Sequence, residues 1–89
     1  MRSVITVTGM DGVGIIAAVS AYLAKHEINI IDISQTTSNK QFLMVMLVDF
    51  EKSDLTFYET EVGLKKIGEK IGQKINLRHE KVFNSMHRI

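Results

Sequence analysis

The sequence of 89 residues contains no cysteine, no proline and no tryptophan. The lack of cysteine excludes a disulfide framework, a thiolate nucleophile and a cysteine-ligated zinc site. With no proline, no low-complexity stretch and no run of like charges, the sequence gives no sign of a linker. We therefore expect a single domain over residues 1–89.

Net charge of one sign and long apolar segments are also lacking. Eleven Lys and Arg residues nearly balance ten Asp and Glu, for a formal charge of +1, so nothing favours nucleic acid or an acidic membrane as a partner. The longest apolar run, residues 42–48, is far too short to cross a bilayer, and no signal-peptide pattern opens the chain. We expect a cytoplasmic protein with no nucleic-acid partner, no membrane partner and no cofactor.

The apolar patterns that are present predict the element order β-α-β-β-α-β. The expected strands are residues 3–8, 28–37, 41–50 and 74–81, and the first expected helix is 15–27. A second helix is expected to follow Ser53 or Asp54 as its N-cap and to end near Ile71, before Gly72. This order is typical of an α+β, ferredoxin-like βαββαβ fold, a four-stranded antiparallel sheet with two helices on one face.

The third predicted strand is apolar on both of its faces. Residues 42, 44, 46 and 48 point one way, whereas Leu43, Val45 and Leu47 point the other. A sheet with one solvated face should carry polar residues there, so we expect its open face or its edge to contact a second copy in a homodimer. The tail carries Phe83, Met86 and Ile89 at helical spacing and is expected to pack on its own sheet or on the neighbouring subunit.

A glycine-rich corner joins the first strand to the first helix. Gly9, Gly12 and Gly14 fall within six residues and surround Asp11, which lies close to where an N-cap or first-turn acid belongs. Free N–H groups and the positive dipole end of a helix make such a corner suitable for an anion. The corner either holds a small molecule or fixes the helix tightly on its sheet.

Three functions of the same frame are excluded by missing side chains. An acylphosphatase-like enzyme needs an arginine in the corner, and residues 9–16 contain none. A metal-delivery domain needs two cysteines after Met10. An RNA-binding sheet needs aromatic residues on its central strands, but Phe42 and Phe50 lie only at the ends of one strand.

The sequence GMDGVGIIAAVS at residues 9–20 resembles the Asp-x-x-Gly-Ile opening of ACT domains, small regulatory modules that commonly bind amino acids. KHEINI at 25–30 is similar to their second landmark. DISQ at 32–35 and FNSMHRI at 83–89 extend the resemblance, over essentially the whole chain, to free-standing short ACT proteins of unassigned function. The opening also resembles the N-terminal ACT domains of formyltetrahydrofolate deformylases and of the glycine-cleavage repressor. Many members carry a basic residue and a proline where this chain has Gly12-Val13, which leaves the ligand preference open.

The resemblance implies a ligand site with two walls, usually between two subunits. One wall is the corner, whose helix N–H groups favour a carboxylate, and the other is the start of the second strand. An ammonium group would meet Asp11 or Asp32, and the Asn29 amide can donate and accept. The expected ligand-binding residues are Asp11, Gly12, Val13, Gly14, Ile15, Asn29, Ile30 and Asp32.

Each of these residues also has a structural explanation. Gly14 could serve only to let the helix sit close on the sheet, Asp11 only to start the helix, and Asn29 only to satisfy the turn before its strand.

Neither a metal site nor catalysis is expected. The histidines, His26, His79 and His87, lack metal-ligand spacing, and no serine has an identifiable histidine partner. We therefore expect a non-enzymatic, homodimeric sensor that binds a small amino-acid-like ligand and passes its state to a protein partner. The alternative is a ligand-free interaction domain that uses its sheet edge or open face.

Overall fold

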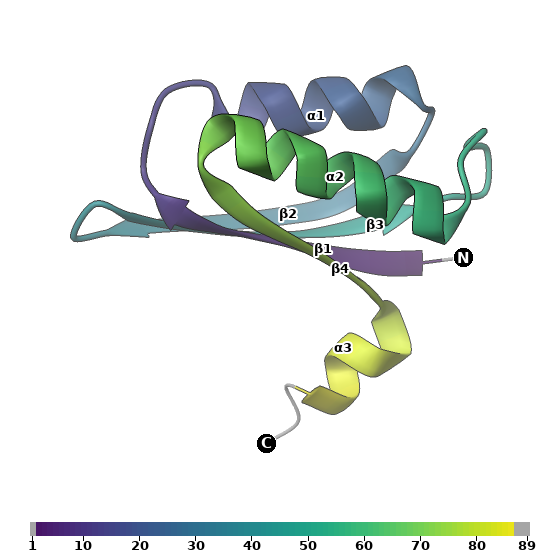
Figure 1. Cartoon of the computed structure of the whole chain (residues 1–89). Coiled ribbons are helices and arrows are strands. Elements are labelled where there is room, and N and C mark those ends of the chain that lie inside the picture. The colour runs from purple at the N-terminus through teal and green to yellow at the C-terminus, as the bar shows by residue number, and fades with distance from the viewer. Residues whose placement is uncertain (1, 87–89) are drawn as a thin grey trace.

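The computed structural model describes residues 2–86 and consists of one antiparallel sheet with helices on both faces. Helices α1 and α2 cover one face, and α3 lies against the other (Figure 1). The strand order is β2-β3-β1-β4, which confirms the predicted ferredoxin-like fold. No helix among the described residues is long and apolar enough to cross a membrane. The elements are β1 (Arg2–Met10), α1 (Ile15–Lys25), β2 (Asn29–Ser38), β3 (Gln41–Asp49), α2 (Phe57–Ile71), β4 (Gln73–His79) and α3 (Glu80–Met86).

The predicted alternation of β3 determines where the core lies. Its helix-facing side chains are buried, whereas Leu43 on the other face is 45% exposed. Burial of these side chains under both helices supplies the main stabilising free energy of the fold. The buried residues of β3 are Phe42, Met44, Met46 and Val48, and they pack with Ile5, Val7, Val19, Leu23, Leu64, Ile75 and Leu77.

Helix α2 begins later than the sequence suggested. Its N-cap is Thr56, whose hydroxyl accepts from the Glu59 N–H at 3.1 Å while the Glu59 carboxylate accepts from the Thr56 N–H at 2.9 Å. The prediction of Ser53 or Asp54 as the cap was wrong, because the Ser53 hydroxyl instead accepts from the Leu55 N–H within a turn before the helix. Gly72 ends the helix with φ of +73°, as predicted.

Gln73 joins the end of α2 to β1 through two close approaches. A Cβ on Gly68 would lie 2.5 Å from the Gln73 carbonyl oxygen, and a Cβ on Gly9 would lie 2.6 Å from the Gln73 side-chain oxygen. The Gln73 amide also donates to the Met10 carbonyl at 2.7 Å. Glycine at position 68 is therefore a condition for this packing, because the atom that it meets belongs to the backbone, whereas a side chain at position 9 would displace the end of the Gln73 side chain and its hydrogen bond.

Strand β2 forms one edge of the sheet and contains a bulge. Ile30 pairs with Val48 and Asp32 with Leu47, so Ile31 is an extra residue in the ladder. The bulge reverses the alternation once, after which Ile33 and Gln35 lie on the helix-covered face.

Helix α3 covers part of the face that the sequence left unexplained. It packs on β1 and β4, and Val4, on that face of β1, is only 5% exposed. Phe83 is half-buried there. The expected helical tail therefore packs on its own sheet within Glu80–Met86, while Ile89 lies outside the described residues. Part of the apolar open face is thus covered by the same chain.

A first prediction concerns Gly68. Replacing it with alanine gains about 1 kcal/mol of helix propensity but introduces a backbone clash with Gln73 that costs about 1–3 kcal/mol. We expect the free energy of unfolding in urea to fall. The same change at Gly12, where nothing lies within 4 Å of an added Cβ, is the control and should leave stability nearly unchanged. Equal effects at both positions would contradict the packing described.

A second prediction concerns α3. Phe83→Ala should lower the free energy of unfolding by about 1–2 kcal/mol, less than for a core phenylalanine because the ring is only half-buried. It should also speed amide exchange at the Val4 end of β1. The exposed neighbour Asn84 provides the control substitution Asn84→Ala. Rapid exchange of the amide hydrogens throughout α3 in the unmodified protein would show that the helix does not pack stably on the sheet.

Candidate functional site

The glycine-rich corner leaves the start of α1 without a side-chain cap. Its N-cap is Gly14, at φ of +86°, and no side chain accepts from the first turn. The first intrahelical hydrogen bond runs from the Ala18 N–H to the Gly14 carbonyl at 2.9 Å. The N–H groups of residues 15–17 therefore precede the first helical bond and carry the positive end of the helix dipole.

Residues 15–17 also line a cavity of about 410 Å³ between the corner and the end of β2. The Asp11 N–H donates to the Lys40 carbonyl at 2.7 Å, which ties the corner to the turn between β2 and β3. The cavity is open to solvent, and its walls combine one carboxylate, an amide, a hydroxyl and apolar groups. The lining residues are Asp11, Gly12, Gly14, Ile15, Ile16, Ala17, Gln35, Thr37 and Phe42.

Two expectations about the corner are corrected by its geometry. Asp11 does not cap α1, because it lies three residues before Gly14, and the first turn contains no acid. Gly14 does not provide a close approach to the sheet, because nothing lies within 4 Å of a Cβ placed on it. Its need for glycine comes from the left-handed φ, which side chains with a Cβ disfavour. Val13, expected in the site, is fully exposed and is not part of the cavity wall.

Asn29 lies at the other end of the sheet within the same chain. It pairs with Asp49, whereas Phe42 at the corner pairs with Gly9, seven positions back along β3. At a rise of about 3.3 Å per residue this separates the two places by roughly 23 Å. The expectation that Asn29 and Asp11 face each other across one cleft therefore does not hold within a single chain.

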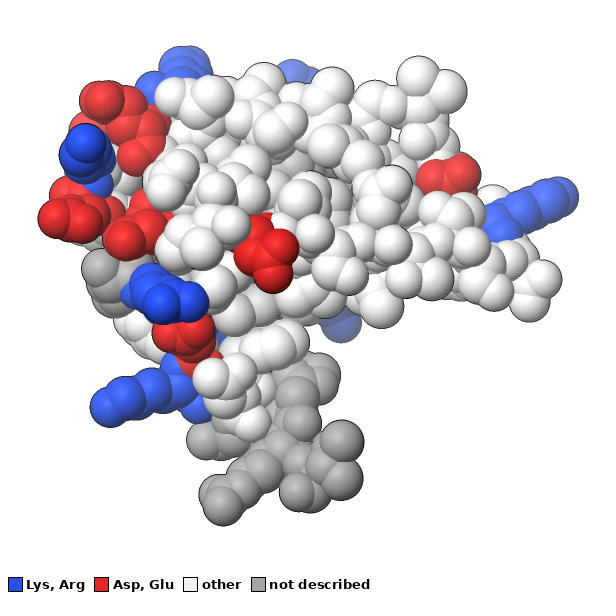
Figure 2. Space-filling model, turned by 180° about the vertical axis from the view of Figure 1, so that it is seen from behind, with Lys and Arg blue, Asp and Glu red and all other residues white. Residues whose placement is uncertain are grey.

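Asn29 instead borders an acidic hollow of about 320 Å³, together with Glu27, Asp49, Glu51 and Lys52. Figure 2 shows acidic side chains gathered at one end of the molecule, toward which this hollow lies. A hydrogen bond from the Glu51 backbone N–H lowers the pKa of Asp49. This end of the sheet carries too much negative charge to attract a carboxylate on its own.

The remaining two predicted site residues lie elsewhere. Ile30 packs against the core cluster. The carboxylate of Asp32 accepts from the neighbouring Ile33 N–H at 2.9 Å and borders a small cavity of about 200 Å³ under α3, with Phe83 and Asn84. Neither side chain reaches the corner cavity.

Gln35 and Thr37 were missed as site residues, although the sequence held a signal for them. The turn at Asn39 and Lys40 sets Thr37 opposite Phe42, and Phe42 opposite Gly9. Counting back along the predicted hairpin from that turn would have placed the end of β2 beside the corner. The family landmark at residues 25–30 points instead to the start of β2.

The corner can hold a small zwitterion. Helix N–H groups suit a carboxylate, the Asp11 carboxylate suits an ammonium group, and Thr37 and Gln35 can donate and accept hydrogen bonds. Among residues 2–86 there is no group of three histidine or acidic side chains placed to hold a metal ion.

Comparison with known proteins agrees with this architecture. The family model of the ACT domain matches residues 2–77. A UPF0237 protein of Methanococcus maripaludis is 50% identical over 86 residues, which cover 97% of this chain and 96% of that protein. An ACT domain protein from Streptococcus pneumoniae superposes with a TM-score of 0.81 at 34% identity, with 93% of each chain covered.

Two larger proteins contain a similar unit. A glycine cleavage system transcriptional repressor has a TM-score of 0.73 at 25% identity, with 86% of this chain and 44% of that chain covered. A formyltetrahydrofolate deformylase of Pseudomonas syringae shares the fold, with a TM-score of 0.79 at 24% identity, over 86% of this chain and 27% of its own. Both resemblances were expected from the sequence. The fold, the corner and these matches together show that the chain belongs to the ACT domain family, among its short UPF0237 members.

Proposed function

We propose that the chain, as one ACT-like domain over residues 1–89, is a homodimeric regulatory module that binds a small amino acid and catalyses no reaction. The observation that carries this proposal is the uncapped start of α1 facing a cavity with a carboxylate, an amide and a hydroxyl. ACT domains are typically regulatory modules for small molecules, and no catalytic role is indicated by the relatives.

The dimer is proposed to form through the exposed edge of β2. Every side chain of the strand except Ile30 is exposed, and Asp32 is its only charged residue. Figure 2 shows this side as a mainly uncharged surface. A long, exposed edge strand with a single charged residue is a template for pairing with another strand. An identical β2 related by a two-fold axis is a natural partner, because such an interface is self-complementary.

In this dimer, the glycine-rich corner of one chain would lie close to the start of β2 of the other chain, although the two are far apart within one chain. Antiparallel pairing of two β2 strands about a two-fold axis at Ser34 sets Ser34 opposite its own copy and Ile30 opposite the partner's Ser38, with Asn29 one position beyond. The start of one β2 then lies beside the corner cavity of the other chain. Of the eight residues expected from the sequence, Asp11, Gly12, Gly14 and Ile15 from one subunit and Asn29 from its partner would then form the site.

A ligand-free role is the second candidate, and the exposed β2 edge favours it independently. Strand pairing needs no ligand, since main-chain hydrogen bonds provide the affinity. A ligand screen separates the two functions. A compound that binds only the folded state stabilises it by about 2.7 kcal/mol at a hundred times its Kd, which thermal unfolding in the presence of each amino acid would detect.

A third prediction tests the dimer. Full pairing of β2 places Ser34 close to its own copy at the two-fold axis, so Ser34→Lys should bring two like charges together and dissociate the dimer. Light scattering at micromolar concentration should change from a dimer mass to a monomer mass. Ser34→Thr is the matched control and should remain dimeric.

Leu43→Lys distinguishes the edge from the open face. Leu43 lies on β3, on the face that α3 only partly covers. If Leu43→Lys separates the subunits and Ser34→Lys does not, then the subunits meet through their sheet faces and the proposed edge pairing is wrong.

A fourth prediction tests the site with an amino acid that the screen identifies. Loss of one hydrogen bond to a charged ligand costs about 1.5–3 kcal/mol, so Thr37→Val and Asn29→Ala should each weaken binding about tenfold to a hundredfold in calorimetry. Thr56→Ser, far from the cavity in the α2 cap, is the control. Weakening by Thr37→Val alone would show that one chain forms the whole site. Unchanged affinity in both variants would place the ligand elsewhere.

A further inference from the structure

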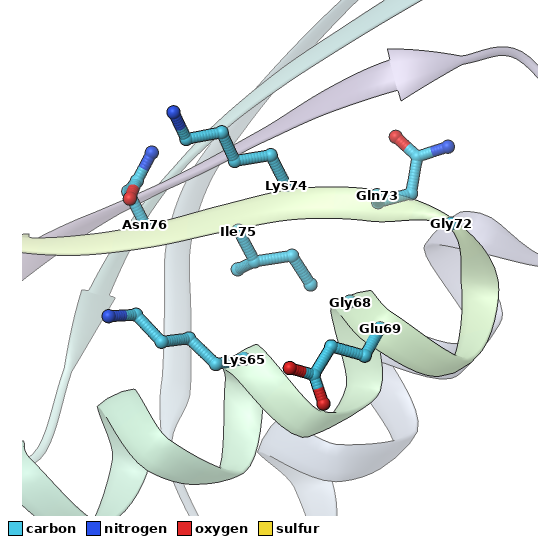
Figure 3. A pocket seen from close by; sticks show the side chains of 8 residues that line it. All are labelled: Lys65, Gly68, Glu69, Gly72, Gln73, Lys74, Ile75 and Asn76. Atoms are coloured by element: carbon cyan, nitrogen blue, oxygen red, sulfur yellow. The ribbon is translucent and has the colours of Figure 1, made fainter.

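The outer edge of β4 borders a groove of about 540 Å³ on the opposite side of the sheet from β2 (Figure 3). Strand β4 is paired only with β1, so its outer edge presents unpaired N–H and C=O groups. The wall across the groove is the second half of α2. It is formed by Lys65, Gly68, Glu69 and Gly72, opposite residues 73–76 of β4.

This edge of the sheet carries positive charge, unlike the rest of the molecule. Residues 2–61 contain four lysines and arginines against eight acids. Residues 62–86 reverse the balance, and no ion pair involves Lys65 or Lys74 among the described residues. The basic residues of this second segment are Lys65, Lys66, Lys70, Lys74, Arg78 and Lys81, against Glu69 and Glu80.

The two unpaired lysines lie on opposite sides of the open strand edge. Lys74 extends from β4 on one side of the strand, and Lys65 lies along α2 on the other, with Ile75 between the strand and the helix (Figure 3). A strand added to β4 would therefore pass between them. On the Lys74 side it would also meet Arg78, because side chains two positions apart share a face. On the helix side it would meet Ile75 and the open space beside Gly72, where nothing lies within 4 Å of an added Cβ.

We propose that the β4 edge binds an extended segment of a partner protein, in which acidic and apolar residues alternate, as a fifth strand of the sheet. Main-chain hydrogen bonds would hold the segment, and the alternation would select it. Acidic side chains would face Lys74 and Arg78, and apolar side chains would face the groove. Four residues of β4 extend about 13 Å, so a segment of four to six residues fills the site.

The same lysines explain why this edge would not pair with its own copy. Lysine on an edge strand prevents edge-to-edge aggregation, because two β4 edges would bring like charges together. The positive charge that repels a second β4 edge also attracts an acidic peptide segment. The two edges of the sheet would then have different partners, a second copy at β2 and an acidic segment at β4.

The test uses a capped seven-residue peptide with three glutamates alternating with valines between terminal serines, labelled for fluorescence anisotropy. We expect it to bind and to shift the NMR amide signals of residues 73–76, with an affinity that falls as salt rises. A peptide of the same composition with glutamates and valines in separate blocks, and one with lysine in place of glutamate, should bind at least tenfold more weakly. Equal binding of the block peptide would overturn the proposal.

Charge reversal tests the role of the lysines. Lys74→Glu should weaken binding of the glutamate peptide about fivefold or more and should strengthen binding of the lysine peptide. The control is Lys25→Glu, an equal change of net charge at an exposed position on α1. If Lys74→Glu promotes self-association but leaves peptide binding unchanged, the lysines only prevent two β4 edges from pairing with each other, and the proposal fails.

Peptide N-methylation separates strand pairing from simple charge attraction. Two methylated peptides are compared. In one, methyl groups replace the hydrogens of the alternate backbone N–H groups that would face β4. In the other, they replace the hydrogens of the N–H groups that would face solvent. We expect methylation of the nitrogens that face β4 to abolish binding, and methylation of the nitrogens that face solvent to preserve it. If both methylated peptides bind like the parent, or if inorganic phosphate at millimolar concentration gives the same amide shifts, the site recognises anions and not a strand.

Discussion

The close approach of α2, β4 and β1 around Gln73 is the constraint on which the rest of the structure depends. Two glycines make room for this residue, one under its carbonyl and one under its side chain, and its amide fixes the Met10 carbonyl where β1 ends. The corner that follows Met10 therefore starts from a fixed point. A second hydrogen bond, from the Asp11 N–H to the Lys40 carbonyl in the turn between β2 and β3, fixes the other side of the corner. The open start of α1 is consequently held by hydrogen bonds from distant parts of the chain.

Local and periodic features of the fold were predictable from the sequence. The alternation along β3 gave both its buried and its open face, and Gly72 marked the end of α2. The N-cap of α2 was missed although the sequence held its signal, because Thr56 and Glu59 have the spacing of a reciprocal capping box and Ser53 has no acid or amide three residues later. The covering of Val4 by α3 was not predictable, because it depends on where the chain turns after His79, for which the apolar spacing gives no direction.

The position of the glycine-rich corner was predictable from the sequence, whereas the position of Asn29 relative to it was not. Glycines between a strand and a helix locate the corner from sequence alone, since few other residues accept the backbone angles of Gly14. The place of Asn29 depends on strand direction, which sets it at the far end of β3. Local motifs carry no information about symmetry. Only an assembled pair of chains would bring such a residue back to the corner.

The bulge at Ile31 has a consequence for how the protein can vary in length. In a regular strand the loss of one residue turns every later side chain to the opposite face. At Ile31 the loss would only remove the extra residue, because Ile30 and Asp32 already pair with consecutive positions of β3. The later residues of β2, including those that border the corner cavity, would keep their faces. This position is therefore one where a descendant of this sequence could shorten by one residue while the sheet and its cavity keep their arrangement.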